Sequence, residues 1–105
     1  MGYEMIFRDP LYSNVIFLLM EIHQFFVYIL YSNALLKFYI GYTSEPIQLR
    51  LEKHLTNHSG FTGKAKDWVI VYFENCTDKP TALRREKEIK SWKSKKKILE
   101  LIDSK

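Results

Sequence analysis

Residues 25–43, FFVYILYSNALLKFYIGYT, decide the fold because they hold two strand-like runs separated by a short polar interval. The runs at 25–31 and 37–43 are rich in β-branched and aromatic side chains, which favour β-strands. Ser32 and Asn33 lie between the runs and are typical turn residues. We therefore predict a β-hairpin over this segment.

Two tyrosines and a glycine stand out in this hairpin. Tyr39 and Gly41 share one face of a regular strand, because alternate side chains point to opposite faces. Tyr28 joins them only if the strand register is right, since a slip of one residue would turn it to the other face. Gly41 leaves space for another group to approach closely. We predict that the hydroxyls of Tyr28 and Tyr39 point into one cleft, together with Arg50, His54 and Glu86.

After the hairpin, hydrophobic periodicity and turn residues predict three helices, a loop and one further strand. Ile47, Leu51 and Leu55 recur at helical spacing after Pro46, and Pro80 and Ser94 suit the first turn and the cap of later helices. These signals predict a helix over 46–57, a loop ending at 67, a strand over 68–74, and helices over 80–92 and 95–102. The expected fold class is α+β, with the order β-β-α-β-α-α.

Composition limits the class of protein. With 105 residues, of which 47% are hydrophobic and 15% aromatic, the chain is expected to form one domain with a modest core. The formal charge of +4 favours a polyanionic partner. Cys76 is the single cysteine, which excludes a disulfide framework and a thiolate metal site and indicates a reducing, cytoplasmic location.

The first twenty residues differ from the remainder. Their apolar run, Val15 to Met20, is shorter than the roughly 20 residues of a membrane span, and no secretory signal pattern surrounds it. We expect residues 1–20 to be a disordered or loosely docked extension, with Met20 as a candidate natural start. The domain is then expected over 21–105, without a membrane interaction.

Three polar residues fall at informative places on the predicted helices. Arg50 and His54 are four residues apart and share one flank of the first helix, where a solvated surface is the alternative interpretation. Glu86 lies in the apolar stripe of the second helix, between Ala82 and Ile89. A carboxylate at such a position is paired, protonated or metal-bound, because an unpaired buried charge is costly. A structural pair with Arg50 or a lysine is the alternative.

Four short motifs in order carry a resemblance to a known family: V-Y-I at 27–29, Y-I-G at 39–41, R-L-x-x-H from Arg50, and A-x-x-x-E-x-x-I-K from Ala82. Over about residues 21–103 the chain resembles the GIY-YIG nuclease domain, and T-G-K-A-K-D-W at 62–68 is similar to its small single-domain bacterial branch. The departure is Phe26-Val27-Tyr28 in place of Gly-Ile-Tyr, which keeps the tyrosine.

The resemblance implies a three-stranded antiparallel sheet flanked by helices, and a metal-dependent endonuclease that acts on nucleic acid, with DNA expected. By this resemblance Glu86 would hold one Mg²⁺ or Mn²⁺ ion, and Arg50 would bind the phosphate. Tyr39 would act as general base or position the water, with Tyr28 and His54 as hydrogen-bonding partners. His54 competes for the role of base, because its reference pKa lies much nearer neutrality than that of a phenol. Gly41 would leave room for the substrate.

Basic residues supply candidates for binding the phosphate backbone. Residues 79–105 contain ten Lys or Arg and four Asp or Glu, an excess that would attract nucleic acid. The candidates are Lys90, Lys95, Lys96 and Lys97 on the helices, and Lys64 and Lys66 in the loop. A solvated helix face and a mobile surface loop are the alternative interpretations.

Two other functions stay open at this point. One is a nucleic-acid-binding module that has the fold without efficient catalysis, and the other is an adaptor whose basic face meets an acidic protein. The sequence does not separate DNA from RNA, a branched from a linear substrate, or a monomer from a weak dimer.

Overall fold

A three-stranded antiparallel sheet in the order β2-β1-β3 forms the centre of the computed structural model, which describes residues 25–105. The strands are β1 (Phe25–Ser32), β2 (Lys37–Thr43) and β3 (Val69–Cys76). β1 pairs with both neighbours, so that Tyr28 lies opposite Gly41 of β2 and Phe73 of β3. The predicted hairpin and sheet are confirmed. The extension predicted over 1–20 lies outside the described residues.

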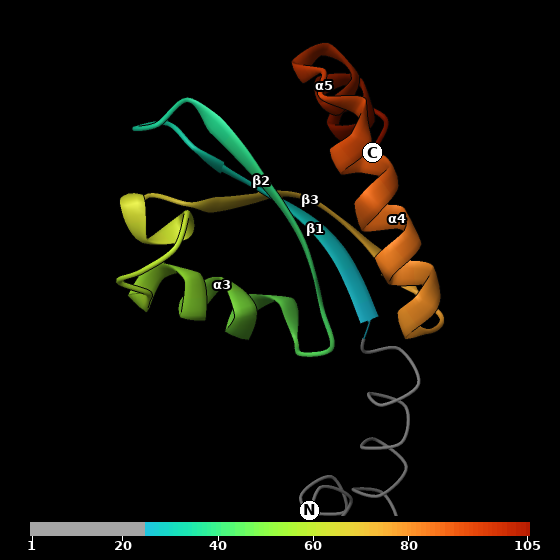
Figure 1. Cartoon of the computed structure of the whole chain (residues 1–105), viewed down its shortest axis with the longest axis horizontal. Coiled ribbons are helices and arrows are strands. Elements are labelled where there is room, and N and C mark those ends of the chain that lie inside the picture. The colour runs from blue at the N-terminus through green and yellow to red at the C-terminus, as the bar shows by residue number, and fades with distance from the viewer. Residues whose placement is uncertain (1–24) are drawn as a thin grey trace, which may run out of the picture.

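Helices cover both faces of this sheet. α3 (Ile47–Thr56) lies on one side, and α4 (Lys79–Trp92) and α5 (Lys95–Asp103) lie on the other (Figure 1). A short 3₁₀ turn, η1 (Thr62–Lys64), precedes β3. The order confirms the predicted β-β-α-β-α-α succession. β3 runs to Cys76, beyond the strand predicted over 68–74, because Cys76 pairs with Phe25 at the start of β1.

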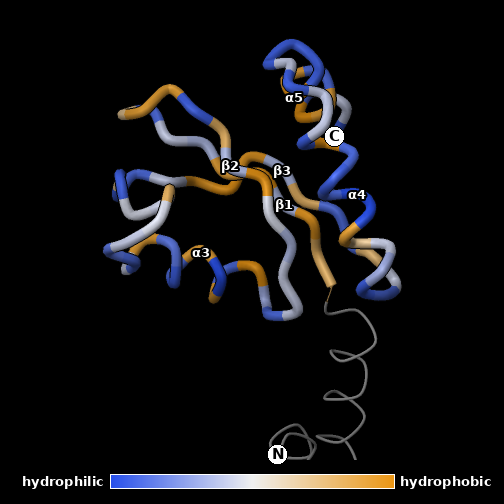
Figure 2. The backbone as a smooth tube through the Cα atoms, viewed as in Figure 1, coloured by the Kyte–Doolittle hydropathy of each residue, from blue (hydrophilic) through white to orange (hydrophobic). Residues whose placement is uncertain are grey.

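The alternation of side chains along β1 divides the core into two clusters. Val27 and Ile29 pack with Ala82 and Ile89 of α4 in the first cluster. Tyr28 and Leu30 belong to the second cluster, with Ala65, Trp68 and residues of α3. Figure 2 shows hydrophobic residues along the central strands and hydrophilic residues on much of α4. Tyr28 therefore belongs to the α3 side of the sheet.

The hairpin turn is tied to the loop that leads into β3. Ser32 is fully buried and donates its hydroxyl to Asp67 Oδ1 at 2.6 Å, while Ala34 N–H donates to Asp67 Oδ2 at 2.8 Å. These hydrogen bonds, that from Ser32 foremost, hold the pKa of Asp67 below its usual value. The contact fixes where the 61–68 segment lies relative to the sheet.

No helix in the described part of the chain is long and apolar enough to cross a membrane.

Candidate functional site

A buried phenol and a buried imidazole meet between β1 and α3. Tyr28 is 1% exposed and His54 is 4% exposed. The Tyr28 hydroxyl lies 2.7 Å from His54 Nε2, and Arg50 Nε donates to the same hydroxyl at 3.4 Å. The strand register thus directs the Tyr28 side chain toward Arg50 and His54, which lie one turn apart on α3.

A threonine holds the other end of the imidazole. His54 Nδ1 lies 3.0 Å from the hydroxyl of Thr62, which is 3% exposed. The indole of Trp68 donates to the Thr62 carbonyl at 2.9 Å, so the backbone at this position is also fixed. Sequence reasoning did not single out Thr62 or Trp68 as parts of the site, although both lie in the T-G-K-A-K-D-W string.

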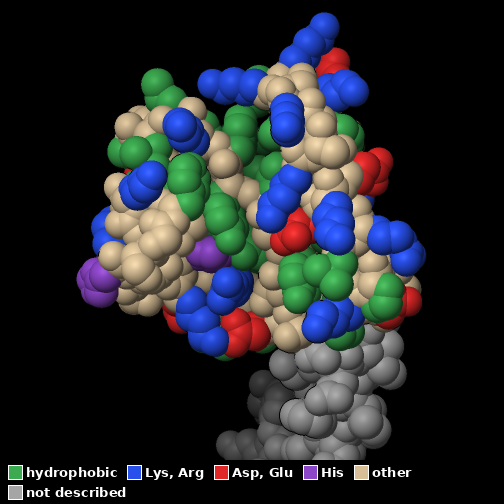
Figure 3. All heavy atoms as spheres, viewed as in Figure 1, with side chains coloured by type: hydrophobic (Ala, Val, Ile, Leu, Met, Phe, Trp, Pro, Cys, Tyr) green, Lys and Arg blue, Asp and Glu red, His purple; other side chains and the backbone are tan. Residues whose placement is uncertain are grey.

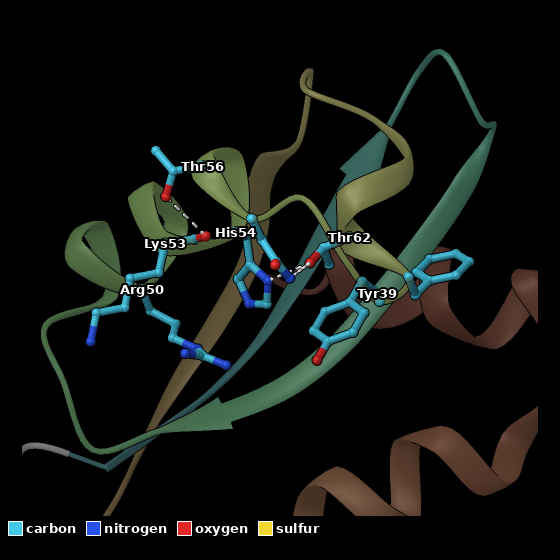
Figure 4. Close-up of a pocket in the computed structure, with 9 residues that line it drawn as sticks. Tyr39, Arg50, Lys53, His54, Thr56 and Thr62 are labelled. Atoms are coloured by element: carbon cyan, nitrogen blue, oxygen red, sulfur yellow. Dashed lines mark hydrogen bonds between the residues drawn. The ribbon is translucent and has the colours of Figure 1, made fainter.

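A cavity of about 420 Å³ opens beside this network. Among the residues that line it are Tyr39, Arg50, His54 and Thr62 (Figure 4). The Tyr39 ring is 5.0 Å from the His54 ring and 6.3 Å from the Tyr28 ring, measured between centroids. Tyr39 is therefore the phenol that reaches the cavity, whereas Tyr28 lies behind the lining residues.

Gly41 is required by the packing of Tyr28. A Cβ atom at Gly41 would lie 2.6 Å from Tyr28 Oη and 2.8 Å from Cζ, distances that real Cβ atoms do not tolerate. The missing side chain therefore leaves room for the Tyr28 phenol within the protein. That Gly41 also gives the substrate access stays a prediction.

Burial and charge set the protonation of these groups. Burial raises the pKa of Tyr28 to about 12, although the hydrogen bond from Arg50 opposes this shift. Burial, followed by the charge of Arg50, lowers the pKa of His54. At neutral pH the site therefore contains a protonated Tyr28 and an uncharged His54.

Glu86 does not line the cavity. It lies on α4, its side chain is 14% exposed, and Lys90 Nζ is 3.5 Å from its carboxylate. The lysine pair weighed as an alternative for Glu86 is thus present. Burial is the main cause of the raised pKa of Tyr28, and the charge of Glu86 makes the smallest contribution to it.

Glu86 could anchor an ion through its own carboxylate alone. Of the acidic side chains paired within residues 25–105, Glu86 is the most buried, and its ion pair is the longest. No group of three or more His, Cys, Asp or Glu side chains in that range could form a metal cage. Mg²⁺ is commonly bound by one or two carboxylates together with water and substrate phosphates. Glu86 is compatible with that mode of binding.

The predicted substrate-binding lysines fall into two groups. Lys64 lies 5.6 Å from the ring of Phe61, a cavity residue, and Lys66 donates to the Asn57 carbonyl at the end of α3. The others, Lys90, Lys95, Lys96 and Lys97, are exposed on α4 and α5. Figure 3 shows a hollow between these two parts of the surface, with lysine and arginine side chains on both sides and a histidine within it.

The domain thus has a basic surface, and on one face of its antiparallel sheet it brings together phenol, imidazole and guanidinium groups. These groups are suited to phosphodiester chemistry. A model of the GIY-YIG catalytic domain matches residues 24–98. The chain therefore belongs to the GIY-YIG nuclease family. Searches of curated proteins and of solved structures gave no match.

The Thr62 contact leads to a first prediction. Thr62→Val keeps the shape of the side chain but leaves His54 Nδ1 without its hydroxyl partner. We expect the free energy of unfolding to fall by about 1–3 kcal/mol, the usual cost of an unpaired buried polar group. Urea denaturation measures this change. Thr62→Ser is the control and should retain most of the stability, and equal stability of the two variants would contradict a role for the hydroxyl.

A second prediction concerns acid sensitivity. The pKa of His54 is lower in the folded protein than in the unfolded chain, where it is about 6.5. Below that pH the unfolded state binds more protons, so the free energy of unfolding should decrease as the pH falls. Denaturation at about pH 7.5 and about pH 5.5 measures this loss. His54→Gln should reduce the loss and His58→Gln, at an exposed histidine, should not; equal losses in both variants would refute the assignment.

Proposed function

We propose that the chain hydrolyses phosphodiester bonds of nucleic acid, with DNA as the expected substrate, in the cavity beside α3. The observation that carries this proposal is the convergence of Arg50, His54 and Tyr39 on one cavity in a member of a nuclease family. Phosphodiester hydrolysis needs an oriented water, a proton acceptor and positive charge at the phosphate. The three side chains have the chemistry for these tasks.

Arg50 is proposed to bind the scissile phosphate. Its Nε atom is committed to the Tyr28 hydroxyl, at 3.4 Å. This bond orients the guanidinium and leaves the two terminal nitrogens for phosphate oxygens, which a planar guanidinium binds well. Tyr28 then serves as a support for Arg50 and His54 behind the cavity.

Tyr39 is proposed to receive or orient the attacking water. It is the tyrosine that lines the cavity, whereas Tyr28 is buried and has a pKa of about 12. His54 remains the competing proton acceptor, because its lowered pKa keeps it uncharged at neutral pH. Its two ring nitrogens are already in contact with Tyr28 and Thr62, which favours Tyr39 for direct contact with water.

Glu86 is the residue proposed to hold one Mg²⁺ or Mn²⁺ ion. The bound ion would supply Lewis-acid stabilisation of the phosphate or the leaving oxygen. Its position in the A-x-x-x-E-x-x-I-K motif that resembles the family supports this role. Lys90, 3.5 Å from the carboxylate, balances its charge within the protein.

Two observations favour a second candidate function, a nucleic-acid-binding module with weak catalysis. Glu86 is outside the lining of the cavity and is paired with Lys90. Phe26 and Val27 also stand where the family motif has Gly and Ile. A chain of this kind would bind nucleic acid through Arg50 and the lysines without efficient turnover.

A third prediction separates these two functions. Glu86→Gln removes the anionic ligand but preserves the shape of the side chain, so cleavage in Mg²⁺ or Mn²⁺ should fall by about a hundredfold or more, the scale for a group that stabilises transition-state charge. The measurement is a panel of single-stranded, duplex, flapped and branched DNA and RNA, with EDTA as the blank.

Glu88→Gln provides the matched control, because Glu88 is an exposed carboxylate on the same helix and pairs with Arg85. It should cleave as the wild type does. Equal activity of the Glu86 and Glu88 variants would exclude Glu86 as the metal ligand. Metal-independent binding without cleavage of any substrate by the wild type would favour the binding module.

A fourth prediction distinguishes the two phenols. Tyr39→Phe should fold and bind but cleave about 10²–10⁴-fold more slowly, the usual loss for a positioned acid–base group. Tyr28→Phe should slow cleavage less, and should also lower stability by about 1–3 kcal/mol, because His54 Nε2 loses its partner. Single-turnover cleavage and urea denaturation measure the two effects. Full turnover in both variants, with loss in His54→Ala, would assign the base to His54.

A further inference from the structure

Two aromatic rings form one wall of the cavity. Tyr39 and Phe61 both line it, with ring centroids 6.3 Å apart and ring planes inclined by 16°. Behind Phe61 lies Trp68, which is 2% exposed and has its centroid 5.7 Å from that of Phe61. Since Trp68 is itself anchored to the Thr62 carbonyl, the wall is supported by a fixed part of the core.

Positive charges flank this aromatic wall. Arg50 lines the same cavity, and Lys64 Nζ lies 5.6 Å from the centre of the Phe61 ring. Two nearly parallel aromatic rings with cations beside them match the chemistry of a nucleotide, whose base stacks and whose phosphates are anionic. A neutral apolar ligand would not explain the two cations.

We propose that Tyr39 and Phe61 stack an unpaired nucleobase adjacent to the phosphate that Arg50 binds. The substrate class of this site is then single-stranded or locally unpaired nucleic acid. In a continuous duplex each base is covered by its neighbours and presents no free face to such a wall, whereas unpaired bases stack readily on aromatic side chains. The proposal rests on the proposed function in assigning a phosphate to Arg50.

The alternative role of Phe61 is packing against Trp68. Leucine at this position would preserve apolar packing but would lose the flat π-face, and tyrosine would preserve the face. These two variants therefore separate stacking from packing. Phe73 is the matched control, because it is an exposed aromatic on β3, 41% exposed, outside the cavity lining.

Equilibrium binding in EDTA, followed by fluorescence anisotropy, tests the proposal without cleavage. Three oligonucleotides of the same sequence serve as probes: one single-stranded, one with an unpaired flap and one fully paired. The wild type should bind the first two more tightly than the duplex. Phe61→Leu should weaken binding of the unpaired probes about fivefold to a hundredfold, the range of one lost base–aromatic stack, and should change duplex binding little.

Phe61→Tyr and Phe73→Leu should bind as the wild type does. Equal affinity of the wild type for paired and unpaired probes would overturn the proposal without any variant, as would an unchanged preference in Phe61→Leu. The nuclease proposal and the stacking proposal can be refuted independently of each other. A Phe61-dependent preference without cleavage would refute the nuclease function alone, whereas rapid cleavage of continuous duplex by both wild type and Phe61→Leu would refute the stacking alone.

Discussion

The hydrogen bond between Tyr28 Oη and His54 Nε2, 2.7 Å long and buried, is the contact on which the arrangement of the site depends. It joins the central strand to α3 at a point where water is excluded, so either group would be costly to bury alone. It exists because the register places Tyr28 opposite Gly41, the one residue type that leaves space for the phenol. The same hydroxyl accepts from Arg50, so the position of the guanidinium follows from the position of this tyrosine.

Local patterns were sufficient to predict most of the fold. Strand-like runs with turn residues identified the hairpin, and the spacing of Ile47, Leu51 and Leu55 identified α3. The placement of Arg50 and His54 on one flank of α3 also follows from such a pattern, because a four-residue step in a helix keeps two side chains on one side. That Tyr28 faces them depends on the strand register, which the sequence pattern does not specify.

The contacts that the sequence did not predict involve the loop before β3 and side chains on opposite faces of the sheet. Thr62 and Asp67 have no periodic neighbours, and their partners, His54 and Ser32, are set by the tertiary fold. For Glu86 the apolar stripe correctly indicated partial burial, but a helical pattern does not specify which residues lie opposite it. The tyrosine hydroxyls were expected to share one cleft, yet Tyr28 is buried behind the wall that Tyr39 helps to form.

The hydrogen bond between Ser32 and Asp67 restricts the length of the loop before β3. Asp67 is held at the hairpin turn, its neighbour Trp68 holds the Thr62 carbonyl, and Thr62 touches the imidazole. Inserting or deleting a residue between Thr62 and Trp68 would therefore shift an anchor at one end and the imidazole at the other. The preceding stretch around Ser59 and Gly60 is exposed, and Gly60 has a left-handed φ of 72°. Gly60 lines the cavity, so a change of length at that point would alter the cavity wall, whereas a change five residues later would shift the imidazole and the hairpin anchor.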